Sequence, residues 1–242
     1  MRVQSLSKLA GIFAFAFLVQ LASYAQSVDE VITKHVTAMG GDKYTNLKSV
    51  KIESSAQIMG MDLPSSTTIA QGRGLRSETT VQGMKIVQGL DGNTGWAINP
   101  MVGQTTAAPI PEEQVKMSAG QLDLTGLYNY KAKGYTAELG AEETIEGAPV
   151  YVMKVNMANG SKATHYISKD TYYILRSAVI VAVQGQEIEA KTNFSNFKQV
   201  DGVTFAFTTE IESPAMPGVM TLIVKSIQVN LTLDENIFTM PK

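Results

Sequence analysis

The sequence contains no cysteine, and only two of its 242 residues are histidines, His35 and His165. Without cysteine the chain can form neither a disulfide nor a thiolate metal site, and it has no thiol nucleophile. Two histidines also argue against a multi-histidine metal site, so we expect no bound metal and no cofactor. A serine–histidine triad has little support, because the sequence contains no GxSxG elbow. We therefore expect a protein that is not an enzyme and has no catalytic residues.

An excess of positive charge is also missing. Lys and Arg together number 20 against 22 Asp and Glu, which gives a formal net charge of −2. Nucleic-acid-binding domains are strongly basic, so we expect no nucleic-acid partner. Apolar residues make up 44% of the chain, which at this length is enough to build a buried core.

The N-terminus has the pattern of a secretory signal peptide. Arg2 and Lys8 supply a basic segment, residues 9–19 (LAGIFAFAFLV) are apolar, and small residues lead up to Ala25. The apolar run is shorter than the roughly 20 residues that a membrane-spanning helix needs. We predict a signal peptide at residues 1–25, cleaved after Ala25. Export of a chain without cysteine is compatible with the bacterial periplasm.

Two short helices are expected. Apolar residues recur at helical spacing from Val28 to Met39, and Gly40 follows as a C-cap. Residues 111–122 begin with proline and two glutamates, a composition typical of a helix start. His35 lies beside the apolar face of the first helix. We interpret it as a boundary histidine near a helix C-terminus, where the helix dipole favours a cation, rather than as a ligand or base.

From Lys48 onward the apolar pattern changes to a period of two, with turn signals at close intervals such as Gly60 to Pro64 and Asp201-Gly202. This pattern predicts a mainly β fold with about ten or eleven antiparallel strands. No repeat or linker interrupts it, so residues 26–242 are expected to form a single domain. Two short helices cannot fully cover so many strands. The remaining apolar face must close as a barrel, pack as a sandwich, or enclose a ligand.

Methionine and tryptophan each leave two interpretations open. The 12 methionines could form a pliable lining for an apolar ligand, or they could simply fill a core. Trp96 follows a glycine-rich turn, where it could gate the mouth of a cavity. Anchoring the core is the more common role for such a tryptophan, and we favour it.

Four segments together resemble one known family. They are residues 35–41 (HVTAMGG), 47–52 (LKSVKI), 89–96 (GLDGNTGW) and 234–241 (DENIFTMP). With them the chain resembles the outer-membrane lipoprotein-sorting (LolA/LolB-like) superfamily, in the form secreted by Bacteroidetes-type bacteria. The resemblance implies an unclosed, or half, β-barrel whose helices cover a concave apolar face. It also implies a carrier of lipoprotein acyl chains or other lipids in the periplasm.

The resemblance further implies partners for such a carrier. They would be a lipid or lipoprotein acyl chain and the envelope proteins that donate and accept it, with only transient membrane contact. The chain lacks the N-terminal cysteine of the anchored receptors, so it is more similar to a soluble carrier, and we expect a monomer. Arg73 and Arg76 lie in a strand-like stretch, and neither aligns with the arginine that closes the helical lid in better-known carriers.

Strand alternation suggests which side chains would line such a ligand site. The predicted hydrophobic lining is Met84, Ile86, Trp96, Ile98, Met153, Val155, Phe205 and Phe207. A shift of one residue in a strand would turn its set to the opposite face.

Two other functions compete with the carrier. One is a secreted structural or partner-binding β-domain with a filled core. The other, which we favour least, is a secreted hydrolase that uses paired carboxylates. The available carboxylates are Glu142, Glu143, Glu146, Glu187 and Glu189. We expect these carboxylates to lie on a solvated face instead.

Overall fold

The computed structural model describes residues 26–183, 186–214, 218–234 and 236–242, so the predicted signal peptide lies outside the described residues. The helical elements are α1 (Val28–Met39), α2 (Asp42–Thr45), η1 (Pro100–Val102), α3 (Glu112–Ser118) and η2 (Ala119–Leu122). The strands are β1 (Ser49–Ile58), β2 (Met61–Ala70), β3 (Gly74–Val81), β4 (Met84–Asp91), β5 (Thr94–Asn99), β6 (Gln104–Pro109), β7 (Thr136–Leu139), β8 (Glu143–Ile145), β9 (Ala148–Asn156), β10 (Lys162–Ser168), β11 (Ile174–Val183), β12 (Gln186–Val200), β13 (Val203–Glu212) and β14 (Val219–Val229).

All these strands belong to one antiparallel sheet of 14 strands, in the order β6-β5-β4-β3-β2-β1-β14-β13-β12-β11-β10-β9-β7, with β8 paired to β9 beside this path. In the described part of the chain β6 and β7 end the path without pairing to each other, so the sheet is not closed into a barrel. The mainly β, unclosed architecture is therefore confirmed. The predicted count of ten or eleven strands was wrong.

The interpretation of Gly60 to Pro64 as a turn was also wrong in its extent. The turn is shorter, and β2 begins at Met61 and continues through Pro64, which pairs with Ser55 of β1. The pairing of β2 with β3 begins only at Ser65, so the missing N–H of Pro64 interrupts no hydrogen bond to β3. The count was too low because short strands such as β6, β7 and β8 carry little periodic pattern.

Helix α1 has the same bounds that the sequence predicted. Ser27 and Glu30 form a capping box, in which each side chain accepts a hydrogen bond from the backbone N–H of the other residue. At the other end Gly40 has φ +129°, and a Cβ built there would lie 2.5 Å from the carbonyl oxygen of Gly202. Only glycine allows this close approach between the end of α1 and the β12–β13 turn.

The helices pack on one face of the sheet, which we call the inner face; the opposite side is the outer face. Val31 and Ile32 of α1 join a buried cluster with residues of β9 and β10. Tyr44 and Leu47 join a second cluster with β1, β13 and β14. A third cluster holds Val115 of α3 and Leu122 of η2 against Leu75 and Leu90 of β3 and β4.

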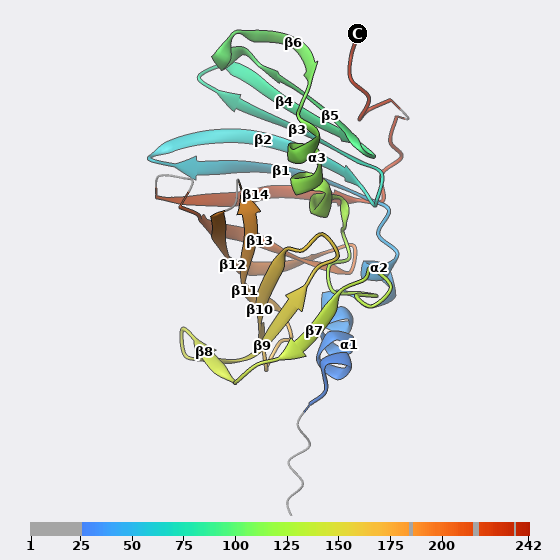
Figure 1. The fold of residues 1–242 in the computed structure, drawn as a ribbon, viewed down its shortest axis with the longest axis vertical. Helices are drawn as coiled ribbons and strands as arrows, with labels where there is room; N and C mark the ends of the chain where they lie inside the picture. The colour runs from blue at the N-terminus through green and yellow to red at the C-terminus, as the bar shows by residue number, and fades with distance from the viewer. Residues whose placement is uncertain (1–25, 184–185, 215–217, 235) are drawn as a thin grey trace, which may run out of the picture.

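The sheet bends strongly along its length. In Figure 1, β9 and β10 run steeply across the view while β1 and β2 run nearly horizontally. The C-terminal segment lies beside β4 and β5, away from the three helices. Its Phe238 is fully buried and its carbonyl accepts a hydrogen bond of 2.7 Å from Nε1 of Trp96. This C-terminal segment therefore covers part of the outer face.

Candidate functional site

Charge is sharply divided between the two faces of β1–β4. These strands contain seven charged residues, and strand alternation with the pairing register places every one on the outer face. They are Lys51, Glu53, Asp62, Arg76, Glu78, Lys85 and Asp91. Several of them pair with each other; Glu78, for example, accepts from both Arg76 and Lys85. The inner face of these four strands is therefore uncharged.

The helices cover only one end of this uncharged face. Leu90 and Leu75, near the ends of β4 and β3 that face α3, are 1% and 4% exposed. At the other end of β3 and β4, and at the adjoining ends of the neighbouring strands β2, β1 and β14, the large apolar inner-face side chains are half-buried or exposed. None of these side chains belongs to the three clusters that the helices form with the sheet. We call this set the open apolar surface; it consists of Ile58, Met61, Leu63, Val81, Met84, Ile86, Met220 and Leu222.

The predicted lining residues do not meet at one place. Met84 and Ile86 belong to the open apolar surface. Met153 and Val155 lie on the inner face of β9, 0% and 2% exposed in the cluster beneath α1. Phe207 is buried and Phe205 half-buried in the cluster that α2 and β1 share with β13.

Trp96 and Ile98 lie on the opposite face. Trp96 pairs with Gly89 and Ile98 with Val87, and both partners are outer-face positions of β4. Trp96 is 2% exposed, and the guanidinium of Arg76 lies 5.5 Å from its ring centroid. A Cβ on Gly89 would come within 2.3 Å of the indole, so glycine is what leaves room for the ring. Trp96 thus anchors the outer face, as the favoured interpretation of this residue expected.

Arg73 and Arg76 have a related position. The guanidinium of Arg73 lies 5.9 Å from the centroid of the Phe238 ring, and Arg76 donates to Glu78. Both arginines therefore act beside the C-terminal segment and not beside α1 or α3.

The interpretation of His35 as a cation at the boundary of α1 was wrong. His35 is 3% exposed, and its Nδ1 donates a 2.8 Å hydrogen bond to the carbonyl oxygen of Tyr172. Burial lowers the pKa of His35, so the ring is neutral near pH 7. Burial also lowers the pKa of His165, to about 4, and its Nδ1 lies 2.8 Å from Oγ of Ser177.

The carboxylates considered for a hydrolase lie at separate exposed places. Glu187 and Glu189 pair with Lys162 and Lys191 at 3.8 and 3.6 Å, with mostly exposed side chains. Glu142 pairs with Lys169. Glu143 and Glu146 are exposed at the β8–β9 hairpin. Within the described residues no group of three or more His, Asp or Glu side chains could hold a metal ion.

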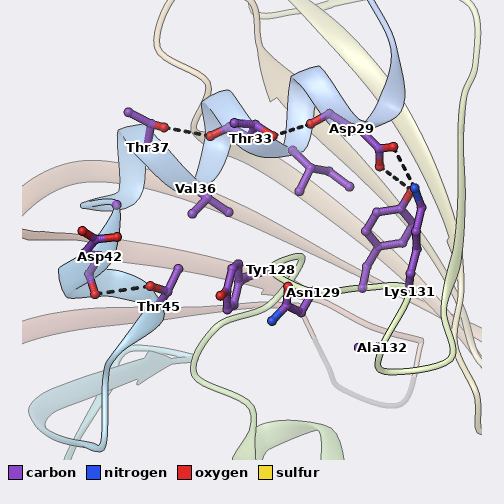
Figure 2. A pocket seen from close by; sticks show the side chains of 13 residues that line it. Asp29, Thr33, Val36, Thr37, Asp42, Thr45, Tyr128, Asn129, Lys131 and Ala132 are labelled. Carbon is purple, nitrogen blue, oxygen red and sulfur yellow. Dashed lines mark hydrogen bonds and ion pairs between the residues drawn. The ribbon is translucent and has the colours of Figure 1, made fainter.

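A groove of about 600 Å³ lies between α1, α2 and the segment around Tyr128 to Ala132 (Figure 2). Its polar groups mostly satisfy each other. Asp29 accepts 2.8 and 2.7 Å hydrogen bonds from Tyr130 and Lys131, and the Lys131 ammonium lowers the pKa of this carboxyl group. Thr33 donates 2.7 Å to the carbonyl of Asp29, within its own helix. The groove carries charges of both signs, so it suits water better than an acyl chain.

No described helix combines the length and apolar character needed to span a bilayer. Because it is apolar, uncharged and uncovered by the helices, the open apolar surface is the candidate ligand site of the described chain. Sequence reasoning found Met84 and Ile86 but missed the other six residues of this surface, which are Ile58, Met61, Leu63, Val81, Met220 and Leu222. The alternation of Met61, Leu63 and Ser65 was the available signal, and Pro64 concealed it.

Comparisons with known proteins place these features in context. A family model whose description is "-like: Uncharacterized protein" matches residues 81–242. No curated protein matches the chain.

Solved structures share the fold. A LolA superfamily protein from Nitrosomonas europaea is 14% identical, with a TM-score of 0.59 over 86% of this chain and 96% of that one. A protein described as an outer membrane lipoprotein-sorting protein domain, from Vibrio parahaemolyticus, is also 14% identical, with a TM-score of 0.57 over 87% and 95%. A DUF1329 family protein from Desulfovibrio piger is 16% identical, with a TM-score of 0.59 over 88% and 97%. At these identities the similarity establishes the fold alone.

Proposed function

The chain belongs to this family of uncharacterised proteins and has the LolA-like fold, and from that premise we propose that it is a periplasmic carrier for a hydrophobic ligand. The ligand class we propose is a lipoprotein acyl chain or another lipid. Donor and acceptor proteins of the envelope would load and unload it, and its contact with the membrane would be transient. The protein would act by binding, without catalysis.

The observation that carries this proposal is the open apolar surface. It spans neighbouring strands, it is uncharged, and the helices leave it uncovered while they bury the other end of the same strands. Contiguous exposed apolar patches on folded proteins mark binding sites for ligands, membranes or other proteins. Each methylene group that a ligand buries contributes about 0.8 kcal/mol, so a long chain can be held without a charged anchor.

The methionines of the surface support a lipid ligand. Met61 and Met84 are 45% and 36% exposed, and methionine adapts its shape to irregular or mobile apolar partners. Acyl chains are such partners, because they do not present one fixed shape.

The test is uptake of an uncharged fluorescent acyl probe by the delipidated protein, residues 26–242. We expect saturable binding that Met84→Asp weakens at least tenfold, because the variant places an unpaired charge against the chain. Met240→Asp is the matched control, since Met240 is 43% exposed but lies in the C-terminal segment. A folded protein that takes up no probe, or one that both variants weaken equally, would overturn the proposal in favour of a structural β-domain.

A further inference from the structure

Hydroxyl and amide side chains form a continuous group on the inner face beside the open apolar surface. The pairing register places Gln88 of β4 opposite Ser77 of β3, and Ser77 opposite Thr67 of β2. One pair further toward the open end, Thr79 of β3 lies opposite Ser65 of β2, and Ser65 opposite Ser54 of β1. We call this set the neutral polar band; it consists of Ser54, Ser65, Thr67, Ser77, Thr79 and Gln88.

The band lies at a boundary along the strands. Toward the helices, the strands continue into the covered core, where Leu75 pairs with both Leu90 and Ile69. In the opposite direction along the strands, still on the inner face, lies the open apolar surface, where Met84 pairs with Val81. Residues two apart on a strand are separated by about 7 Å, so the polar groups lie within one or two side chains of the apolar ones. An amphiphile could rest its chain on the open apolar surface and its polar group on the band.

Four members of the band already have partners. Ser54 and Ser65 share a hydrogen bond of 2.8 Å between their hydroxyl oxygens, and Thr67 and Ser77 share one of 3.2 Å. Such pairs are ordinary cross-strand contacts that stabilise a sheet. They do not by themselves indicate a ligand.

Thr79 and Gln88 are different. Both side chains are half-buried, and neither makes a side-chain hydrogen bond within the described part of the chain. Solvent still reaches both groups, because no fully buried side-chain polar atom of the described residues lacks a hydrogen-bond partner. The Thr79 hydroxyl and the Gln88 amide can therefore donate to a ligand that displaces this water and supplies an acceptor.

The charge around the band defines which ligand suits these donors. The cationic side chains nearest in sequence, Arg76 and Lys85, lie on the outer face and are paired with Glu78. Lys198 of β12 also lies on the inner face, over the ring of Phe207, but β13 and β14 separate its strand from the band. A carboxylate or phosphate brought to the band itself would therefore lose hydration without gaining a counter-charge. An ester or amide carbonyl needs only a neutral donor, and it loses less on leaving water.

We propose that the neutral polar band selects amphiphiles whose acyl chain ends in an uncharged ester or amide, and that it discriminates against free fatty acids and other anionic lipids. Thr79 and Gln88 donate to the carbonyl of that linkage while the chain lies on the open apolar surface. This inference rests on the proposed carrier function and adds the ligand class to it.

The test compares two ligands with the same hydrocarbon chain, monooleoylglycerol and oleate, at pH 8. They compete with an uncharged fluorescent probe whose hydrocarbon chain is attached without a carbonyl group, so that the probe can contact the open apolar surface but cannot accept from the band. We expect the ester to compete at least tenfold better than oleate. Thr79→Val with Gln88→Leu should weaken the ester about tenfold, the loss expected when one or two neutral hydrogen bonds are removed, while probe affinity stays nearly constant. Thr79→Val alone nearly preserves the side-chain shape and should cause part of the loss in ester affinity. This single variant replaces the double variant in the test if the double variant does not fold.

The matched control is Thr80→Val with Gln57→Leu, which changes the same residue types on the outer face of β3 and β1. It should leave both competitors unchanged. Oleate that competes as well as the ester, or an ester preference that survives in the folded inner-face variant, would overturn the inference while leaving the carrier function intact. Failure of the wild-type protein to bind the probe would instead overturn the carrier function, and this inference with it.

Discussion

The two ends of strand β4 show how one face of a sheet can serve two purposes. Leu90 and Met84 both point to the inner face, but Leu90 is 1% exposed and Met84 is 36% exposed. The difference comes from what lies above each residue. Val115 and Leu122 of α3 and η2 pack on the end that holds Leu90, whereas Met84 belongs to none of the clusters that the helices form.

The contrast teaches that the helices divide the inner face into a covered core and an exposed apolar surface, while the strands themselves run through both. The covered end stabilises the fold because its apolar area is permanently removed from water. The open end keeps apolar area available for a ligand. Mutations at the covered end should therefore lower mainly the stability of the fold, whereas mutations at the open end should lower mainly the affinity for the proposed ligand.

The largest effect should come from Leu90→Ala. Removing a fully buried leucine lowers the free energy of unfolding by about 3 kcal/mol, because apolar contacts are lost and a cavity is left. Met84→Ala, at the open end, should cost less than about 1 kcal/mol. Urea unfolding followed by circular dichroism measures both. Equal losses at the two positions would break the distinction between covered and open ends.

The outer face should respond strongly to Gly89→Ala, by about 2 kcal/mol, because the added Cβ would meet the Trp96 ring at 2.3 Å. The shift would also disturb the hydrogen bond from Trp96 to Phe238. Gly120→Ala is the control, since a Cβ there meets nothing within 4 Å. Thermal unfolding compares the two variants, and a neutral Gly89→Ala would show that the C-terminal segment adjusts freely to the indole.

Acidification should weaken the fold through the buried histidines. The pKa of His165 is about 4 in the folded protein, below its ordinary value near 6.5. The unfolded chain therefore binds more protons between these two values, so stability is complete above about pH 6.5 and falls as the pH drops toward 4. From pH 7 to pH 5 we expect a loss of about 1–2 kcal/mol in urea unfolding. His165→Gln should reduce this dependence of stability on pH. An unchanged pH dependence in the variant would mean that another group is responsible for it.

The smallest effect concerns Trp96. It is buried on the outer face, on the far side of the sheet from Met84 and Ile86. Its fluorescence emission should therefore stay unchanged when an acyl probe fills the open apolar surface, even though probe binding itself is measurable. A clear emission shift at saturation would mean that the ligand, or a conformational change, reaches the outer face.

Much of the fold could be predicted from local patterns. The helical spacing and the following Gly40 gave the bounds of α1, and the period of two gave the mainly β, antiparallel class. The place of Pro64 inside β2 was not predictable in this way. A proline is tolerated there because β3 pairs with β2 only from Ser65 onward, and that pairing is a property of neighbouring strands.

The candidate site was predictable only in part. Met84 and Ile86 were assigned to the lining, but so were Trp96 and Ile98, which face the other way. Alternation tells which residues of one strand share a face, but it does not tell which face points inward when both are apolar. In β4 both Ile86 and Val87 are apolar, so only the pairing of Gly89 with Trp96 settles the orientation of β5.

The sequence by itself determined that this chain has alternating apolar strands and lacks the residues for disulfides or thiolate metal sites, since both follow from residue types and their spacing. It also determined where α1 begins and ends, because capping acts between residues a few positions apart. The tertiary structure decided how much of the inner face the helices cover, and which strands bring Thr79, Gln88 and the open apolar surface together. Those outcomes depend on contacts between residues that are distant in the chain, and only the folded sheet defines them.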